Sequence, residues 1–67
     1  MSVERVTRIV STSPDGFEDA IRDGLNRAKR TLRNLRRLDV VSHAARLDLT
    51  GEIKEYEVTL DITFVLE

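Results

Sequence analysis

The carboxyl-terminal segment constrains the fold more than any other part of this chain. Apolar and polar side chains alternate strictly up to Leu66. One face carries Tyr56, Val58, Leu60, Ile62, Phe64 and Leu66, and the other carries Glu55, Glu57, Thr59, Asp61 and Thr63. A period of two sustained this far predicts a β-strand with one buried face. At 3.3 Å per residue, that strand is about 45 Å long and exceeds most strands in globular proteins.

The segments before this strand predict one strand and one helix. Val3–Val10 is rich in β-branched residues and predicts a short amphipathic strand. Ser13 followed by Pro14 is typical of a helix start, with Ser13 as the capping residue. An apolar stripe then predicts a helix of about six turns that ends near Leu35. The stripe consists of Phe17, Ile21, Leu25, Ala28 and Leu32.

Two further features complete the predicted fold. Gly24 lies on the apolar stripe, which indicates a close approach of the helix backbone to a neighbouring surface. In Leu38–Leu49 the alternation changes phase around Val40 and Val41, as in a β-bulge or in a strand buried on both faces. With a turn at positions 50–52, the order is strand, helix, strand, strand. We therefore predict an α+β fold, with a three-stranded antiparallel sheet partly wrapped around one helix.

The length of the chain predicts self-association. Its 67 residues allow a single domain, residues 1–67. A domain this small buries a marginal core and usually needs disulfides, a metal or partners. There is no cysteine, and His43 is the only histidine, which excludes a zinc site built from His and Cys within one chain. Association with further copies is the remaining remedy.

Composition excludes several classes of function. Eleven Lys and Arg against twelve Asp and Glu give a net charge of -1, which gives no reason to expect nucleic acid binding. No apolar run reaches the length of a membrane span, and the first residues do not form a signal peptide, so a cytoplasmic location is expected. No Cys-His or Ser-His-Asp spacing and no Gly-rich phosphate loop stands out, so we do not expect an enzyme.

The same segments resemble the dodecin family. Dodecins carry a Thr-Ser before the helix, and this chain has Ser11-Thr12-Ser13. The helix pattern of the family is matched by Ala20-Ile21, Leu25-Asn26-Arg27-Ala28 and Thr31-Leu32-Arg33, and the pattern of its last strand by the six alternating apolar residues from Tyr56 to Leu66. The resemblance implies a hollow homododecamer with helices outside and sheets inside. It further implies storage or sequestration of flavin (riboflavin, FMN or FAD), without a catalysed reaction.

The resemblance also points to the candidate flavin site. In the family, flavins bind in pairs near the threefold axes, between tryptophans of two subunits, and glutamine amides hold the ring edge. The tryptophan position is Arg37 here, with Arg36 and Leu38 beside it, and the glutamine position is Glu57. A planar guanidinium can stack on an aromatic ring, so Arg37 is the expected stacking residue. An arginine found a few residues past the tryptophan in many dodecins aligns with Ala44.

Other interpretations of the same residues remain. Arg37 could be a solvated residue of a basic run at a helix end, and Glu57 could be an exposed strand carboxylate or could pair with Arg37. The chain could instead be a dodecin-like shell without flavin, which binds cations or serves as a scaffold. Glu57 and Asp61 share a strand face and, with copies of themselves, could hold a hard cation. His43 could ligate a metal on a symmetry axis or could simply be packed.

Overall fold

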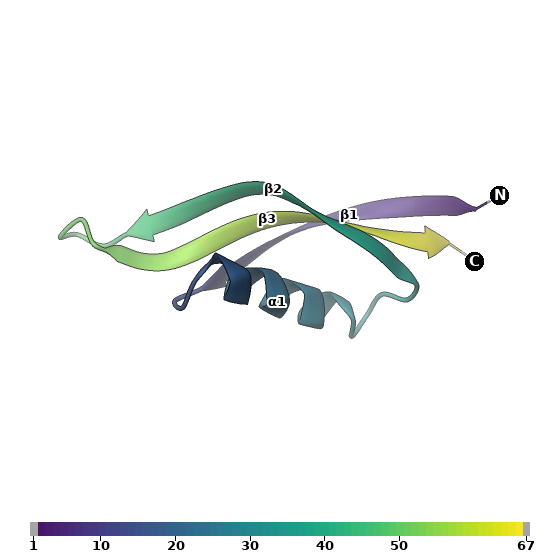
Figure 1. Cartoon of the computed structure of the whole chain (residues 1–67), viewed down its shortest axis with the longest axis horizontal. Coiled ribbons are helices and arrows are strands. Elements are labelled where there is room, and N and C mark those ends of the chain that lie inside the picture. The colour runs from purple at the N-terminus through teal and green to yellow at the C-terminus, as the bar shows by residue number, and fades with distance from the viewer. Residues whose placement is uncertain (1, 67) are drawn as a thin grey trace.

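The computed structural model describes residues 2–66. Its elements are β1 (Val3–Ser13), α1 (Phe17–Ala28), β2 (Leu35–Leu47) and β3 (Ile53–Leu66). The strands form one antiparallel sheet in the order β1-β3-β2, and α1 lies across one face of it (Figure 1). The predicted strand-helix-strand-strand order, the terminal hairpin and the two-layer α+β architecture are confirmed.

The central strand β3 supplies most of the core. Its side chains Val58, Leu60 and Ile62 are at most 1% exposed. They belong to the apolar face that the alternation predicts, and this face points toward α1, whose Ala20 packs against Val58 and Leu60. Burial of each such aliphatic side chain contributes about 1.5–3 kcal/mol. Because β1 and β2 flank β3 on both sides, both edges of its backbone are hydrogen-bonded within the chain.

Small residues form the contact line of the helix. Ala20, Gly24 and Ala28 are the buried residues of α1, spaced one turn apart. A Cβ atom at Gly24 would lie 2.9 Å from Leu60 Cδ1 and 3.1 Å from Ser11 Cβ. The predicted close approach at Gly24 is therefore confirmed. The larger apolar residues of the predicted stripe are half-buried beside this line rather than at its centre.

The helix is shorter than predicted at both ends. Ser13 is not its cap but the buried last residue of β1, and its Oγ accepts a hydrogen bond from the Asp15 N–H at 3.1 Å. This local turn uses the hydroxyl that was predicted to cap the helix. After Ala28 the N–H of Thr31 donates to the Ala28 carbonyl over three residues, and Asn34 adopts a left-handed φ of 60°. These turns end the helix early and lead into β2 at Leu35.

Three shifts of register interrupt the pairing of β2 with β3. Two of them add a residue to β2 and lie between Leu35 and Arg37 and between Val40 and Ser42; the third, at Arg46/Leu47, adds a residue to β3. The second shift confirms the bulge predicted at Val40 and Val41. The first was not predicted, because that part of the chain was assigned to the helix. Each of the first two shifts adds one residue to β2 and therefore reverses which side chains face α1.

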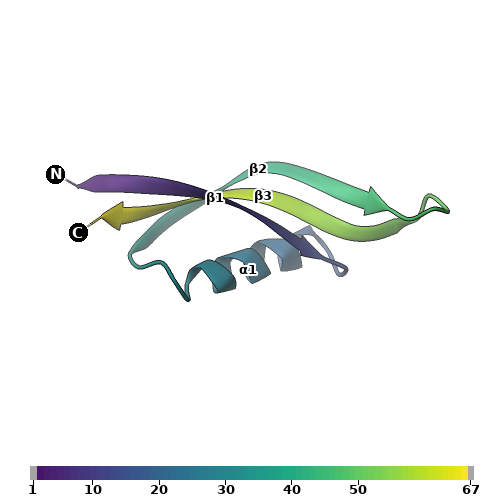
Figure 2. The ribbon, with the colours of Figure 1, turned by 180° about the vertical axis from the view of Figure 1, so that it is seen from behind.

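The molecule is elongated, and the helix covers only its middle. The principal dimensions are 52 × 19 × 14 Å. The β2–β3 hairpin extends beyond α1 at one end and the two termini extend beyond it at the other (Figures 1 and 2). Large apolar side chains are exposed along these extensions; they include Val3, Val6, Leu47, Leu49 and Ile53. Within residues 2–66, no helix is both long enough and apolar enough to span a membrane.

Candidate functional site: the open face of the sheet

The candidate residues lie mainly on the sheet face opposite α1, which we call the open face. Its members follow from the strand register, because successive strand residues point to opposite faces. The open face is built from Val6, Arg8, Val10 and Thr12 of β1, Arg37, Asp39, Ser42, Ala44 and Arg46 of β2, and Glu55, Glu57, Thr59, Asp61 and Thr63 of β3. It is the polar face that the alternation in β3 predicts.

The second register shift brings two arginines of β2 to the same face. Arg37 pairs with Thr63, and Arg46 pairs with Glu55. The two arginines are nine positions apart, an odd separation that would place them on opposite faces of a regular strand. The bulge at Val41 corrects the phase, so both side chains belong to the open face.

Arg37 is held by its neighbour Asp39. Its Nε donates to Asp39 Oδ2 at 3.1 Å and its Nη2 donates to Asp39 Oδ1 at 2.7 Å. These hydrogen bonds, together with the carboxylate charge, raise the pKa of Arg37 above its ordinary value. The side chain of Arg37 remains 67% exposed. A guanidinium bound in this two-pronged way has a fixed plane, while its flat surface stays accessible.

Glu57 is bound by Arg46. Arg46 Nη2 donates to Glu57 Oε1 at 2.9 Å, and its Nη1 lies 3.5 Å from Glu55 Oε1. The hydrogen bond to Glu57 and the charges of both carboxylates raise the pKa of Arg46. Arg46 was not among the predicted site residues. Its position on the face of Glu57 depends on the hairpin register and on the bulge.

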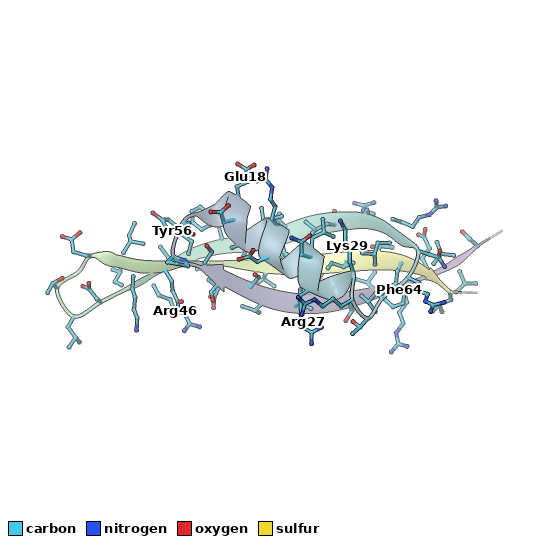
Figure 3. All side chains as sticks on the ribbon, turned by 90° about the horizontal axis from the view of Figure 1, so that it is seen from below. Glu18, Arg27, Lys29, Arg46, Tyr56 and Phe64 are labelled. Carbon is cyan, nitrogen blue, oxygen red and sulfur yellow. The ribbon has the colours of Figure 1, made fainter. Side chains whose placement is uncertain are left out.

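Arg37 and Glu57 do not pair within the chain, so this predicted interaction is wrong for a single copy. Arg37 lies opposite Thr63, whereas Glu57 lies opposite Ala44. At 3.3 Å per strand residue, positions 57 and 63 are about 20 Å apart. In Figure 3, Arg46 and Tyr56 lie toward the hairpin end of the sheet and Phe64 lies toward the other end.

The remaining predicted site residues lie beside Arg37. Arg36 occupies the first register shift of β2, and its Nε is 3.9 Å from Glu4 Oε2. Leu38 pairs with Ile62 and packs against the core on the helix side. Arg36 and Arg37 lie on β2, so the predicted position of this basic run at a helix end is wrong, although both side chains are exposed. A hollow of about 220 Å³ is lined by Leu25, Leu35, Arg36, Arg37, Leu38 and Ile62, but not by Glu57.

The other polar groups considered as ligands already have partners. Arg8 Nε donates to Asp61 Oδ1 at 2.7 Å, and this interaction lowers the pKa of Asp61. His43 packs edge-on against Phe17, with ring centroids 5.0 Å apart. Residues 2–66 contain no group of three or more His, Cys, Asp or Glu side chains that could hold a metal ion.

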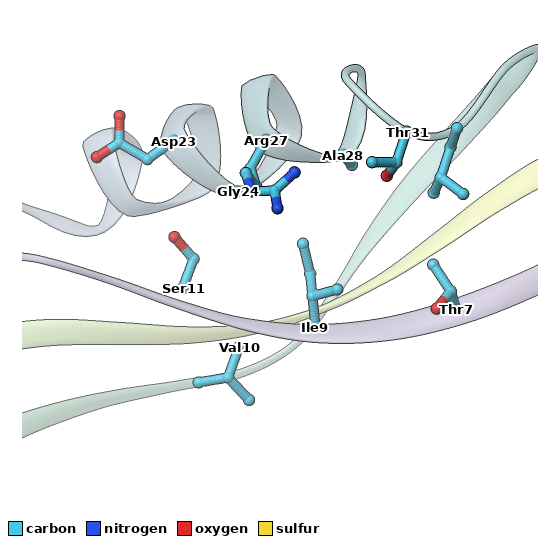
Figure 4. Close-up of a pocket in the computed structure, with 10 residues that line it drawn as sticks. Thr7, Ile9, Val10, Ser11, Asp23, Gly24, Arg27, Ala28 and Thr31 are labelled. Carbon is cyan, nitrogen blue, oxygen red and sulfur yellow. The ribbon is translucent and has the colours of Figure 1, made fainter.

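A larger groove lies away from the predicted site residues. It has a volume of about 440 Å³ and runs between α1 and the outer edge of β1 (Figure 4). Its lining includes Ile9 of β1 and Asp23, Gly24 and Arg27 of α1. None of Arg36, Arg37, Leu38 or Glu57 lines it.

Comparison with known proteins identifies the family. The Dodecin family model matches residues 3–67. The dodecin of Thermus thermophilus is 38% identical over 65 residues, which cover 97% of this chain and 93% of that protein. A calcium dodecin of Mycobacterium tuberculosis is 31% identical over 64 residues, with 96% and 89% coverage. The solved dodecin from Streptomyces davaonensis has a TM-score of 0.91 at 44% identity, with 98% and 96% coverage. The chain belongs to the dodecin family.

Proposed function

We propose that this chain is a binding protein, not an enzyme, and that it stores or sequesters flavin in a hollow homododecamer. The ligand is riboflavin or a flavin nucleotide. Arg37 stacks on the isoalloxazine ring, and Glu57 contacts the edge of the ring. Arg36 adjoins Arg37 in the strand, whereas the Leu38 side chain lies on the helix side and supports the backbone beneath the site. Family membership supports the fold and the general role, and the geometry around Arg37 supports the ligand.

The two hydrogen bonds from Arg37 to Asp39 are the observation on which the proposal depends. Stacking is favoured by a flat group whose orientation is already fixed, because binding then orders fewer rotamers, and this pair provides such a group on an accessible face. An arginine stacked on an aromatic ring contributes roughly 0.5–2 kcal/mol, according to how far the contact is desolvated. The affinity is therefore expected to be lower than tryptophan would give at the same position.

The separation of Arg37 from Glu57 supports a site shared between copies. A flavin ring is far shorter than the roughly 20 Å between their positions on the sheet. One ring can contact both residues only if they come from different chains. This requirement agrees with the exposed apolar side chains along both ends of the sheet, which need partners to cover them.

Riboflavin fluorescence tests the proposal. Titration of purified protein into riboflavin should quench the emission to saturation. Arg37→Ala should weaken binding severalfold or more, because the stacking surface is lost. Arg22→Ala is a matched control, since Arg22 is also exposed and paired with a carboxylate, but on α1. Unchanged emission with the wild-type protein would refute flavin binding, and equal titrations for both variants would exclude Arg37 from the site.

Calcium is the second candidate ligand, because a relative bears the name calcium dodecin. Binding through Asp61 and Glu57 would require the cation to displace Arg8 and Arg46 from those carboxylates. Flavin is therefore the better-supported ligand of the open face. Calorimetry distinguishes the two candidate ligands. If calcium releases or absorbs heat on addition to the protein and riboflavin does not, calcium is the better-supported ligand.

A further inference from the structure

The edge of a flavin ring needs both hydrogen-bond donors and acceptors from a protein. The pyrimidine part of isoalloxazine presents an imide N–H flanked by two carbonyl oxygens. A glutamine amide both donates and accepts, whereas an ionised carboxylate only accepts. Glu57 can therefore accept from the imide N–H but can donate nothing to the neighbouring carbonyls. A donor must come from another group.

Arg46 is in position to provide that donor. Its guanidinium is hydrogen-bonded to Glu57 at 2.9 Å, and its side chain is 59% exposed. A guanidinium has five N–H donors and a carboxylate has about four acceptor positions, so one hydrogen bond between them leaves capacity on both. The ion pair thus presents donor and acceptor groups side by side on the open face.

We propose that Arg46 and Glu57 together recognise the imide edge of the flavin. Arg46 donates to a ring carbonyl oxygen, and Glu57 accepts from the imide N–H. This inference rests on the proposed flavin binding and adds the selectivity of the site. The ligand must carry an imide N–H next to a carbonyl, so a flavin methylated at N3 fits poorly against Glu57.

The hydrogen bond from Arg46 also compensates the negative charge of Glu57 next to the ligand. Without Arg46, the Glu57 oxygens would lie near the carbonyl oxygens of the ring, with acceptor opposed to acceptor. Removal of Arg46 should therefore reduce the affinity for two reasons: a hydrogen-bond donor is lost, and the repulsion between Glu57 and the ring carbonyls is no longer offset. Because a hydrogen bond to a charged group contributes enough free energy for a tenfold change in affinity, Kd should increase about tenfold.

The test is a set of fluorescence titrations with riboflavin and N3-methylriboflavin. The wild-type protein should bind the methylated flavin about tenfold more weakly, since one charge-assisted hydrogen bond is lost. Arg46→Ala should weaken riboflavin binding by a similar factor. In a Glu57→Gln background, where the amide donates as well as accepts, Arg46→Ala should have little further effect. Arg22→Ala again serves as the matched control and should bind as the wild type does.

The outcomes separate this inference from the proposed function. No binding of riboflavin by the wild type overturns both. If the wild type and Arg46→Ala bind riboflavin with equal affinity, the inference alone is overturned. Equal affinity of the wild type for the two flavins also overturns the inference alone.

Exposed ion pairs contribute little to stability, so Arg46→Ala is expected to fold. Light scattering checks this. If the alanine variant does not assemble, Arg46→Gln decides, because its amide keeps a donor and should retain part of the affinity.

Discussion

Arg37 and Asp39 form a flat unit that neither residue makes alone. Their two parallel hydrogen bonds fix the guanidinium plane, and the opposite charges offset each other. An unpaired arginine on a strand samples many rotamers, and binding would have to order it. Asp39 therefore acts as a positioning residue: it prepares the surface on which we propose that flavin stacks.

Asp39→Ala should weaken riboflavin binding severalfold through loss of this preorganisation. In an Arg37→Ala background, the same change should have almost no effect, because there is no guanidinium left to position. Fluorescence titration of the two single variants and the double variant measures this coupling. Additive losses would show that Asp39 acts independently of Arg37.

A substitution at Gly24 tests the packing between helix and sheet. Gly24→Ala brings a methyl group to 2.9 Å from Leu60 Cδ1, and Leu60 is fully buried and cannot move aside freely. Overpacking costs about 1–3 kcal/mol, whereas the helix propensity gained from alanine is only about 1 kcal/mol. The free energy of unfolding should decrease in urea titrations at fixed protein concentration. Asn26→Ala, exposed on the same helix, should not reduce it.

At the scale of an element, one carboxylate accepts three hydrogen bonds in the turn of the β2–β3 hairpin. Asp48 Oδ1 accepts hydrogen bonds from the Thr50 hydroxyl at 2.6 Å, the Thr50 N–H at 2.9 Å and the Glu52 N–H at 3.1 Å. The Thr50 hydroxyl is the largest of several contacts that lower the pKa of Asp48. The ionised carboxylate therefore supplements the backbone hydrogen bonds of the turn, in which the Asp48 N–H donates to the Glu52 carbonyl at 2.8 Å and the Gly51 N–H donates to the Asp48 carbonyl at 3.1 Å.

The lowered pKa predicts the pH dependence of stability. A carboxyl group whose pKa falls on folding stabilises the native state above its ordinary pKa, and this contribution is lost as the pH falls through the folded value. Asp48 and Asp61 both behave in this way. Tm should therefore decrease as the pH is lowered from about 5 to 3. Asp48→Asn should make this decrease shallower, and Thr50→Val should do so in part. If Tm of both variants fell with pH as steeply as Tm of the wild type does, the assignment to Asp48 would be contradicted.

At the scale of the whole molecule, the sheet is longer than its single helix can cover. The chain extends 52 Å along its longest axis, and α1 has only 12 residues, or about 18 Å at 1.5 Å per residue. Val3, Leu47 and Ile53 are each at least half exposed beyond it. A second or further copy that covers these ends would bury apolar area which the single chain leaves in water.

Light scattering after size-exclusion chromatography should give a mass near twelve times 7.7 kDa. Because the proposed assembly would cover apolar side chains that a single chain exposes, Tm should also rise with protein concentration. A compact, stable monomer in dilute solution would contradict the proposed assembly, and with it the flavin site shared between copies.

Much of the fold could be predicted from the sequence, but the helix ends could not. The alternation in β3 identifies the central strand because the side-chain period of a strand is fixed at two. Ser13-Pro14 has the composition of a helix start, yet the Ser13 hydroxyl closes a turn after β1 instead. The same short polar side chain suits either role, and the extent of strand pairing decides between them.

The sequence by itself determined which elements form, which face of β3 is buried and where Gly24 must approach the sheet, because periodicity and residue size are local properties. Only the tertiary structure decided which charged groups meet. Asp39 is bound to Arg37, whereas Glu57 is bound to Arg46, eleven positions before it in the chain. These partners follow from the hairpin register and from a one-residue bulge, and a shift of one residue in either would turn Arg46 toward the helix.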